Sequence, residues 1–360
     1  MLALLPTGAG KSICFQVPGL VLGGITLVVS PLIALMQDQV GGLMGRGIGA
    51  FALTGYVEPA VFAYVLDKAA SSPHFFIYAA PEKLKSRQVQ KIFETGRVRL
   101  IAVDEAHCIS AWGHHFRPSY RRISDLRIQY PGIPMCAMTA TATPATVRDI
   151  VRNLKLKTII RGSFDRTNIE WAFIHKIDAR SKVIELITAN PGAAIVYSST
   201  RVGVNVWTEK LNRSGIPALA YHAGMAPSER EKSQRSWLQK RRDVIVATNA
   251  FGMGIDRPDV RLVIHVGVPG SIEAYYQEAG RAGRDGLPSR SVLIVTPEGV
   301  KDRLALIKSR RSRRLFKPMQ RLVERPMCRK WGILGYFGQT APESCDQCDH
   351  CLTALSTAKL

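Results

Sequence analysis

Residues 6–12, with the sequence PTGAGKS, combine two glycines with a lysine and a serine. Gly8 and Gly10 would let the backbone turn its N–H groups inward at the start of a helix, which creates an anion-binding site. In such a loop Lys11 reaches the β- and γ-phosphates of a nucleotide and Ser12 is a ligand of Mg²⁺. The strict pattern G-x-x-x-x-G-K-[S/T] is not met, because Leu5 occupies its first position. The alternative interpretation is a glycine-rich turn with an exposed lysine. The candidate nucleotide-binding residues are Pro6, Thr7, Gly8, Ala9, Gly10, Lys11 and Ser12.

A pair of adjacent carboxylates follows the apolar run in LIAVDEAHC, residues 100–108. Asp104, at the end of a predicted strand, can hold Mg²⁺, and Glu105 can orient and deprotonate an attacking water. His107 would then sense the state of the phosphate. Acidic residues after a buried strand also occur as simple loop formers. Together with the loop at residues 6–12, however, the pair favours nucleotide hydrolysis.

Two arginines recur at short spacing in YYQEAGRAGRDG, residues 275–286. The sequence predicts a short glycine-spaced helix that carries Gln277, Arg281 and Arg284. The i, i+3 spacing would place both arginines on one helix face. Two guanidinium groups there can stabilise charge on a transferring phosphoryl group, as arginine fingers supplied by a second domain. A solvated arginine-rich helix, the alternative, fits poorly with three glycines in so short a stretch.

Four of the seven cysteines form the pattern C-x16-C-x2-C-x2-C near the end of the chain. Four thiolates at this spacing predict a closed, tetrahedral Zn²⁺ site with a structural role, made by Cys328, Cys345, Cys348 and Cys351. The other three, Cys14, Cys108 and Cys136, lie in apolar segments and are expected in the core.

The elements that must position these residues are short apolar runs that alternate with helical patterns. Continuous apolar strands separated by helices predict parallel sheets covered on both faces, with ligands at the carboxyl ends of the strands. Two series of such runs predict two α/β domains joined near residues 161–171. The predicted strands are residues 25–30, 75–80, 100–106, 135–142, 193–199, 218–224, 243–249, 260–266 and 291–296.

The composition points to a polyanionic partner. Lys and Arg number 49 against 28 Asp and Glu, a net charge of +21, and residues 301–330 alone contribute twelve basic residues against two acidic ones. Such a surplus favours nucleic acid first and an acidic membrane second, with a solvated basic surface as the alternative. No apolar run reaches the roughly 18 residues that a bilayer span needs. A soluble, intracellular protein is expected, with cysteines used for packing or metal rather than for disulfides.

These motifs in this order resemble those of superfamily 2 helicases. The stretches DEAHCISAWGHHFRPSY, MTATATP and FGMGIDRP narrow the resemblance to the RecQ family of DNA helicases. The similarity extends over nearly the whole chain, from PTGAGKS through VVSPLIALMQDQV and YHAGM to the final cysteines. Helicases of this type resemble P-T-G-x-G-K-S at the phosphate loop, so Leu5 is no objection.

The resemblance implies an α/β fold with two RecA-like parallel-sheet domains, residues 1–160 and 161–297, followed by a small helical zinc-binding module, residues 298–360. It implies ATP, Mg²⁺ and Zn²⁺ as cofactors, with ATP bound between the two domains. Hydrolysis would drive movement along single-stranded DNA from 3′ to 5′, with unwinding of duplex in DNA repair or recombination.

An aromatic loop after the carboxylates contains Trp112, His114, Phe116 and Arg117. Aromatic faces and an arginine plane can stack on bases at about 1–3 kcal/mol each. In the RecQ family similar loops couple DNA binding to ATP hydrolysis. His115 stands where an acid is usual in the family and Ser119 where Glu often stands, which puts the strength of the coupling in doubt.

Hydroxyl groups in TATAT, residues 139–143, could relay between the Mg²⁺ site and the DNA path through Thr139 and Thr141; alternatively they cap the following helix. Further candidates for contacts with DNA or at the domain interface are Ser30, Gln37, Gln39, Thr248 and Asp256.

The resemblance implies single-stranded and forked DNA as partners, with a single-stranded-DNA-binding protein or other repair factors as further candidates and no membrane. The expected location is the bacterial cytoplasm, near the nucleoid, or the nucleus of a eukaryote. Two alternatives stay open: a related RNA helicase, and a DNA-binding ATPase without unwinding activity. Because Lys11 lies so close to Met1, an N-terminally truncated chain that reads adenine poorly is also expected.

Overall fold

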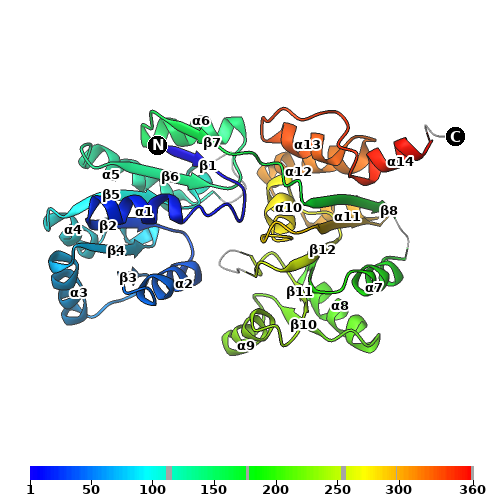
Figure 1. Ribbon diagram of the computed structural model, residues 1–360, viewed down its shortest axis with the longest axis horizontal. Coiled ribbons are helices and arrows are strands. Elements are labelled where there is room, and N and C mark those ends of the chain that lie inside the picture. The colour runs from blue at the N-terminus through cyan, green and yellow to red at the C-terminus, as the bar shows by residue number, and fades with distance from the viewer. Residues whose placement is uncertain (111–115, 176–177, 253–256, 297, 358–360) are drawn as a thin grey trace. The chain divides into compact units, whose positions relative to one another are not determined.

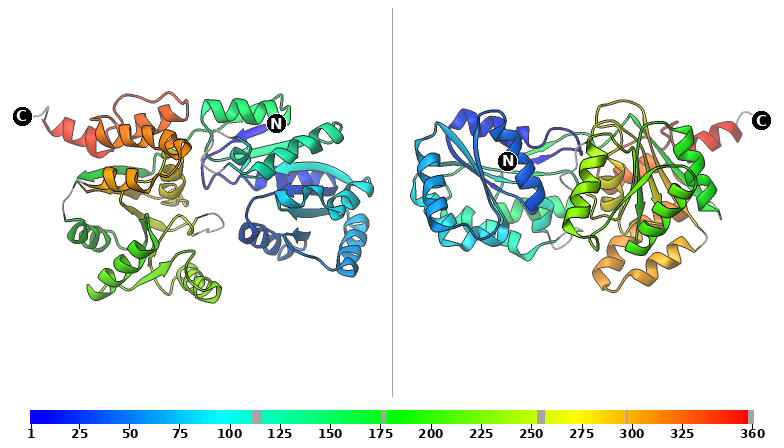
Figure 2. Two further views of the ribbon diagram at one scale, coloured as in Figure 1. Left: turned by 180° about the vertical axis from the view of Figure 1, so that it is seen from behind. Right: turned by 90° about the horizontal axis from the view of Figure 1, so that it is seen from below.

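In the computed structural model the chain forms two compact units, residues 1–162 and 163–360. The structure describes residues 1–110, 116–175, 178–252, 257–296 and 298–357. Each unit is a parallel sheet with helices on both faces (Figure 1 and Figure 2). The predicted α/β class with two parallel-sheet domains is confirmed.

The first unit is built on a seven-stranded sheet with the strand order β3-β4-β2-β5-β6-β1-β7. Its strands are β1 (Leu2–Leu4), β2 (Gly24–Val29), β3 (Gly49–Leu53), β4 (His74–Ala79), β5 (Val98–Val103), β6 (Met135–Thr139) and β7 (Ile159–Arg161). Its α-helices are α1 (Ile13–Leu22), α2 (Ile33–Met44), α3 (Pro59–Ser71), α4 (Arg87–Glu94), α5 (Ile123–Gln129) and α6 (Pro144–Leu154). Short 3-10 helices span Pro81–Lys85, Ala106–Ile109 and Pro118–Arg122.

The second unit is built on a six-stranded sheet with the order β10-β11-β9-β12-β13-β8. Its strands are β8 (Ile169–His175), β9 (Ala193–Ser198), β10 (Ala218–Tyr221), β11 (Val244–Ala247), β12 (Val260–Val266) and β13 (Ser289–Val295). Its helices are α7 (Ala179–Ala189), α8 (Arg201–Arg213), α9 (Pro227–Leu238), α10 (Ile272–Ala279), α11 (Gly299–Leu306), α12 (Arg310–Glu324), α13 (Arg329–Tyr336) and α14 (Asp349–Thr357).

All nine predicted strands are present, because a strand covered by helices on both faces must be apolar along its whole length. Every residue of β2 and of β9 is buried, for example. Strands β1, β3, β7 and β8 were not predicted. β8 begins inside the stretch expected to be the polar joint, and β1 is only three residues long.

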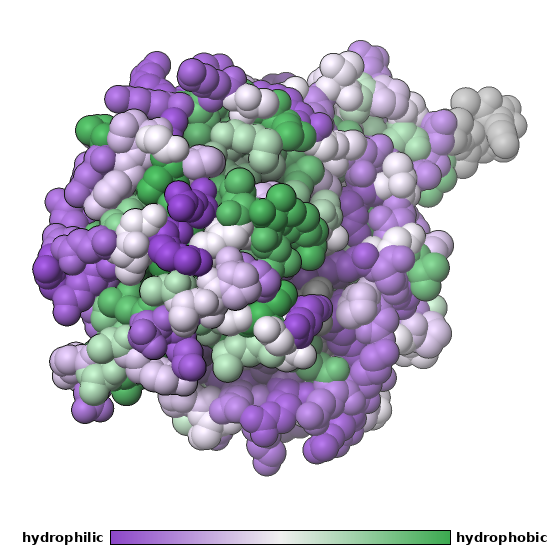
Figure 3. All heavy atoms as spheres, turned by 60° about the vertical axis from the view of Figure 1, so that its left-hand side comes forward, coloured by the Kyte–Doolittle hydropathy of each residue, from purple (hydrophilic) through white to green (hydrophobic). Residues whose placement is uncertain are grey.

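Helix α1 is a source of exposed apolar surface in the first unit. Its side chains Ile13, Val17, Val21 and Leu22 are between 49% and 81% exposed. Figure 3 draws one face of the molecule and shows a group of apolar residues near its middle, bordered by hydrophilic residues.

Residues 298–357 fold as a helical module against the second sheet. Helices α13 and α14 pack on β8, and α12 packs on α10. The module buries two basic side chains, Arg329 and Lys330. Arg329 forms an ion pair with Asp349 at 2.9 Å and lies over the ring of Phe173, so its charge is compensated where it is buried.

Candidate active site

The glycine-rich loop at residues 6–12 leads from β1 into α1, at the carboxyl edge of the first sheet. Gly8 and Gly10 have φ angles of 84° and 71°, a left-handed conformation that side chains rarely adopt. Lys11 donates from Nζ to the carbonyl oxygen of Pro6 at 3.3 Å. The two glycines therefore provide the turn that a phosphate-binding loop needs, and the lysine lies against that turn.

Ser12, the candidate Mg²⁺ ligand, belongs to a chain of side-chain hydrogen bonds. Its Oγ accepts from Gln39 Nε2 at 2.8 Å, and Gln39 Oε1 accepts from Gln16 Nε2 at 3.0 Å and from the Tyr78 hydroxyl at 3.3 Å. Gln39, a candidate for contact with DNA or at the domain interface, lies beside the phosphate loop. Gln16 and Tyr78 were missed, because no local pattern distinguishes them from packing residues. Gln37, the neighbouring candidate, is exposed on α2.

Asp104 and Glu105 follow β5 directly. Asp104 Oδ2 accepts from the Ser30 hydroxyl at 3.3 Å, and its Oδ1 accepts from the Glu105 N–H at 2.9 Å. Ser30, a candidate for contact with DNA or at the domain interface, thus lies beside the Asp104 carboxylate. Glu105 has a φ of 47°, a left-handed conformation that is costly for a residue with a side chain and that concentrates at functional sites.

The charges around Asp104 link it to the phosphate loop. Burial raises its pKa, the neighbouring Glu105 carboxyl adds to the effect and Lys11 opposes it, so that the pKa of Asp104 is about 6. A divalent cation held by the Asp104 carboxylate and the Ser12 hydroxyl would relieve this repulsion with the oxygen ligands that Mg²⁺ prefers. The donor set therefore fits Mg²⁺.

This raised pKa predicts a pH dependence. Below about pH 6 Asp104 becomes protonated and can no longer bind a cation, so kcat/KM for ATP should fall with decreasing pH, about tenfold per unit at the low end. Steady-state ATP hydrolysis measured between pH 5 and pH 8 tests this. Since a bound cation stabilises the carboxylate, kcat at saturating Mg²⁺ and ATP should have its inflection at lower pH. A kcat/KM that is constant from pH 5 to pH 7 would contradict the assignment.

His107 connects the carboxylate pair to β6. The ring is fully buried, and its Nδ1 lies 3.1 Å from Glu105 Oε2 and 2.9 Å from Thr139 Oγ1. Burial lowers the pKa of His107, but contacts with Cys108 and Glu105 more than offset it, so that the pKa is raised to about 10. His107 therefore contacts both Glu105 and Thr139.

The threonines of residues 139–143 have different roles. The hydroxyl that caps α6 belongs to Thr143, which accepts from the Thr146 N–H at 3.3 Å. Thr139 faces His107 instead, and the buried Thr141 donates its backbone N–H to Thr139 Oγ1 at 3.3 Å. This geometry favours the relay over the capping alternative.

The aromatic loop is described only from Phe116 onward; Trp112 and His114 lie outside the described residues. Arg117 donates from Nη1 to the carbonyl oxygen of Pro31 at 2.7 Å. The Arg121 guanidinium lies over the ring of Phe116. Tyr120, which the sequence did not single out, donates its hydroxyl to the Asp104 carbonyl oxygen at 3.0 Å. Two hydrogen bonds from side chains to carbonyl oxygens therefore join this segment to Asp104 and to Pro31, just beyond β2.

In the second unit the predicted arginine helix is shorter than expected. α10 ends at Ala279, so Gln277 lies on the helix while Arg281 and Arg284 lie in the turns beyond it. The two arginines therefore do not share a helix face. The physical reason is that glycines at 280 and 283 favour turns over helix. Arg281 is buried and lies beside Tyr197.

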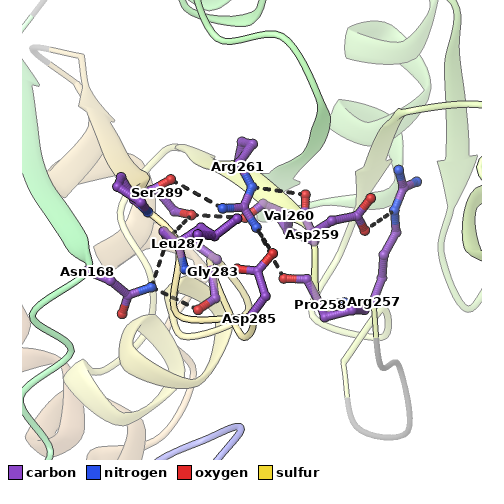
Figure 4. A network of polar contacts seen from close by, with 12 residues as sticks. Asn168, Arg257, Pro258, Asp259, Val260, Arg261, Gly283, Asp285, Leu287 and Ser289 are labelled. Atoms are coloured by element: carbon purple, nitrogen blue, oxygen red, sulfur yellow. Dashed lines mark hydrogen bonds and ion pairs between the residues drawn. The ribbon is translucent and has the colours of Figure 1, made fainter.

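The turn that carries these arginines is fixed by a polar network (Figure 4). The Gly283 N–H donates to the Val260 carbonyl at 2.8 Å, and Asn168 Nδ2 donates to the Gly283 carbonyl at 2.8 Å. A side chain at Gly283 would come within 2.4 Å of Asn168, so only glycine fits. Arg261 also pairs with Asp285. The turn that carries Arg281 and Arg284 is therefore held by hydrogen bonds to Val260 and Asn168.

Other sequence candidates are less informative. Thr248 accepts from the Ala250 N–H at 3.3 Å, a local turn contact, and Asp256 lies outside the described residues. Cys108 and Cys136 are buried as expected, and Cys14 is partly buried.

The four C-terminal cysteines come together. Their sulfur atoms all lie within 4.8 Å of one another, and the Cys348 and Cys328 sulfurs are 4.0 Å apart. Zn–S bonds of about 2.3 Å require sulfurs roughly 3.8 Å apart, so the cluster fits Zn²⁺ after a small contraction. Backbone N–H groups of Trp331, Arg329 and Cys345 donate to three of these sulfurs, each at 3.4 Å. Such donors stabilise thiolates in metal sites.

The basic segment forms an amphipathic helix. In α12 Phe316, Met319 and Leu322 are buried, while a stripe of basic side chains at helical spacing is exposed: Arg310, Arg313, Lys317 and Arg321. A basic face on a helix whose other face is packed is available to phosphates.

Three protein families match successive parts of the chain. The DEAD/DEAH box helicase family matches residues 1–150, the helicase conserved C-terminal domain matches residues 178–286, and the RecQ zinc-binding family matches residues 301–352. The RecQ proteins of Pasteurella multocida and Haemophilus influenzae, both named ATP-dependent DNA helicases, are 39% and 40% identical over 98% of this chain. The chain belongs to the RecQ family of helicases.

The predicted RecQ resemblance is thus confirmed. The chain covers 57% and 58% of these two relatives, somewhat over half of their length. Among solved structures, Mycobacterium smegmatis helicase Lhr bound to ssDNA and AMP-PNP is similar with a TM-score of 0.62 and 23% identity, over 84% of this chain and 44% of that one. At this identity the similarity concerns the RecQ chain's fold alone. Within its described residues, no helix is long and apolar enough to cross a membrane.

Proposed function

We propose that this RecQ-family chain is an ATP-dependent DNA helicase core, which couples ATP hydrolysis to 3′ to 5′ movement on single-stranded DNA and to duplex unwinding. The observation that carries the proposal is the Asp104–Glu105 pair at the end of β5, whose electrostatics include Lys11 of the phosphate loop. Family membership and the names of the RecQ relatives support DNA as the nucleic acid.

The residues of the first unit would have separate roles in ATP hydrolysis. The turn at residues 6–12 holds the phosphates, and Lys11 balances their charge. Mg²⁺, held by Ser12 and Asp104, would supply further charge neutralisation. Glu105 would orient the attacking water and accept its proton, while His107 and Thr139 report the state of this site to β6.

The second unit would supply the remaining groups. Gln277, Arg281 and Arg284 are proposed to act on the bound ATP, because guanidinium groups can stabilise charge on the transferring phosphoryl group. The turn network of Figure 4 supports this role, because an arginine finger needs a rigid base. Trp112, His114, Phe116 and Arg117 are proposed to contact DNA and to couple its binding to hydrolysis.

The basic stripe of α12 is proposed as a second phosphate-contacting surface, for single-stranded or forked DNA. We also propose that the chain acts in DNA repair or recombination, together with a single-stranded-DNA-binding protein or other repair factors.

ATPase stimulation by different nucleic acids tests the proposal. We expect single-stranded DNA to raise the ATP hydrolysis rate at least about tenfold more than single-stranded RNA of the same length and sequence. The two should be compared at several salt concentrations, because phosphate contacts weaken as salt rises. Stronger stimulation by RNA would favour a related RNA helicase. Stimulation by DNA without strand separation on a 3′-tailed duplex would favour a DNA-binding ATPase that does not unwind.

A further inference from the structure

One hydrogen bond joins the zinc-binding module to the helix that precedes the arginine turn. Tyr336, the last residue of α13, donates its hydroxyl to Glu273 Oε1 at 2.6 Å. Glu273 lies in the first turn of α10, sixty-three positions earlier in the chain. Since α13 starts directly after Cys328, the bond links the cysteine cluster to α10 through a single short helix.

Glu273 depends on this bond. The residue is only 2% exposed, and its other carboxyl oxygen, Oε2, is buried without a hydrogen-bond partner among the described residues. Burial, with the nearby Glu273 carboxyl, raises the pKa of Tyr336 above its ordinary value, so the phenol stays a donor. Loss of the partner of a buried carboxyl costs much more than an exposed hydrogen bond would.

The surrounding contacts hold α10 at both ends. Phe337 is fully buried and packs edge-on against Tyr276, with ring centroids 5.2 Å apart. At the far end of α10, Glu278 Oε2 lies 2.9 Å from His265 Nε2 of β12. A helix of eight residues is a rigid rod, so a displacement at Glu273 is carried along it to Gln277 and to Arg281, two residues beyond its end.

We propose that Tyr336 is a positioning residue for ATP hydrolysis: by holding Glu273 it fixes α10, and with it the placement of Gln277 and Arg281. The inference rests on the proposed function, in which these two side chains act on ATP. It gives the zinc-binding module a part in hydrolysis that is separate from any contact of the module with DNA.

The test is Tyr336→Phe, which removes one oxygen and leaves the ring. We expect kcat of the DNA-stimulated ATPase to fall about tenfold, equivalent to about 1.4 kcal/mol in the barrier. KM for ATP, Kd for single-stranded DNA and bound zinc should stay within about twofold of the wild type, because Tyr336 is not among the residues proposed to hold these ligands. A purely structural defect would lower zinc content and DNA affinity together with kcat.

Tyr275→Phe is the matched control. Tyr275 lies on α10, the helix that carries Glu273, and is fully buried. Its hydroxyl lies 3.2 Å from the neutral Ser291 hydroxyl rather than beside a carboxyl. Its kcat should stay near that of the wild type. Glu273→Gln combined with Tyr336→Phe should cost no more than the larger single effect, since both substitutions remove the same bond. If the double variant lowered kcat by the product of the two single effects, the proposed coupling of Tyr336 to Glu273 would be contradicted.

Hydrogen exchange gives a readout that needs no activity. In Tyr336→Phe the backbone amides of residues 272–284 should exchange at least about fivefold faster, while those of β2 and β5 stay unchanged. Unchanged exchange in residues 272–284, or unchanged kcat, would overturn the positioning role. A wild-type chain that hydrolyses no ATP would contradict the proposed function instead, and the exchange result distinguishes that failure from failure of the Tyr336 contact.

Discussion

Replacing Lys11 with alanine is expected to abolish DNA-stimulated ATP hydrolysis, with a loss of at least about 10²–10³-fold in kcat. Lys11 is the only cation in residues 6–12, and it lies against the turn formed by Gly8 and Gly10. Without it the β- and γ-phosphates keep their backbone donors but lose the charge that balances them. Phosphate release measured with saturating single-stranded DNA checks the prediction.

The control for Lys11→Ala is Lys85→Ala. Lys85 is 68% exposed, and the Asp125 carboxylate lies 4.0 Å from its ammonium group at the surface, so removal of Lys85 should leave hydrolysis unchanged. Both variants should retain the wild-type zinc content, because the cysteine cluster belongs to the other unit. Hydrolysis by Lys11→Ala within a few-fold of the wild type would refute the assignment of the phosphate loop.

Replacing Cys348 with serine is expected to remove bound zinc and to lower the yield of folded protein. Cys348 is a fully buried member of the cluster, and its sulfur accepts a hydrogen bond from the Arg329 N–H. A structural Zn²⁺ site contributes roughly 10–16 kcal/mol, and a hydroxyl cannot replace a thiolate ligand. Metal analysis should show about one zinc per chain in the wild type and little in the variant.

Cys14→Ser is the matched control for Cys348→Ser. Cys14 is partly buried in α1, and the cysteine cluster belongs to the other unit of the chain, so replacement of Cys14 should change neither zinc content nor soluble yield. A Cys348→Ser protein with normal yield and no zinc would show that the cluster is not needed for folding. Full zinc occupancy in that variant would show that Cys348 is not a ligand.

The parts of the site that depend on local spacing could be predicted from sequence. The positive φ angles at Gly8 and Gly10, the carboxylates at the end of β5 and the cluster of four cysteines all follow from residue types at fixed short separations. The central strands were also predictable, because burial on both faces leaves an uninterrupted apolar run. The short strands β1 and β7 leave no such run and were missed.

Contacts between distant positions could not be predicted in this way. Ser30 meets Asp104 because β2 pairs with β5, a consequence of the sheet order and not of any motif. The sequence indicated which arginines could act on a phosphoryl group, but the prediction that both lie on one helix was wrong. Glycines at 280 and 283 end the helix, and Arg281 and Arg284 lie in turns held by Asn168 and Val260.

By itself, then, the sequence determined the chemical groups of this RecQ chain: the phosphate loop, the adjacent carboxylates, the arginine pair and the four thiols. Only the tertiary structure decided which neighbours each group has, as for Gln39 at Ser12, His107 at Thr139 and Tyr336 at Glu273. The physical reason is that backbone turns are set within a few residues, and that three of the four thiols, Cys345, Cys348 and Cys351, recur at short spacing. Buried polar pairs instead depend on sheet order and on which helix ends meet.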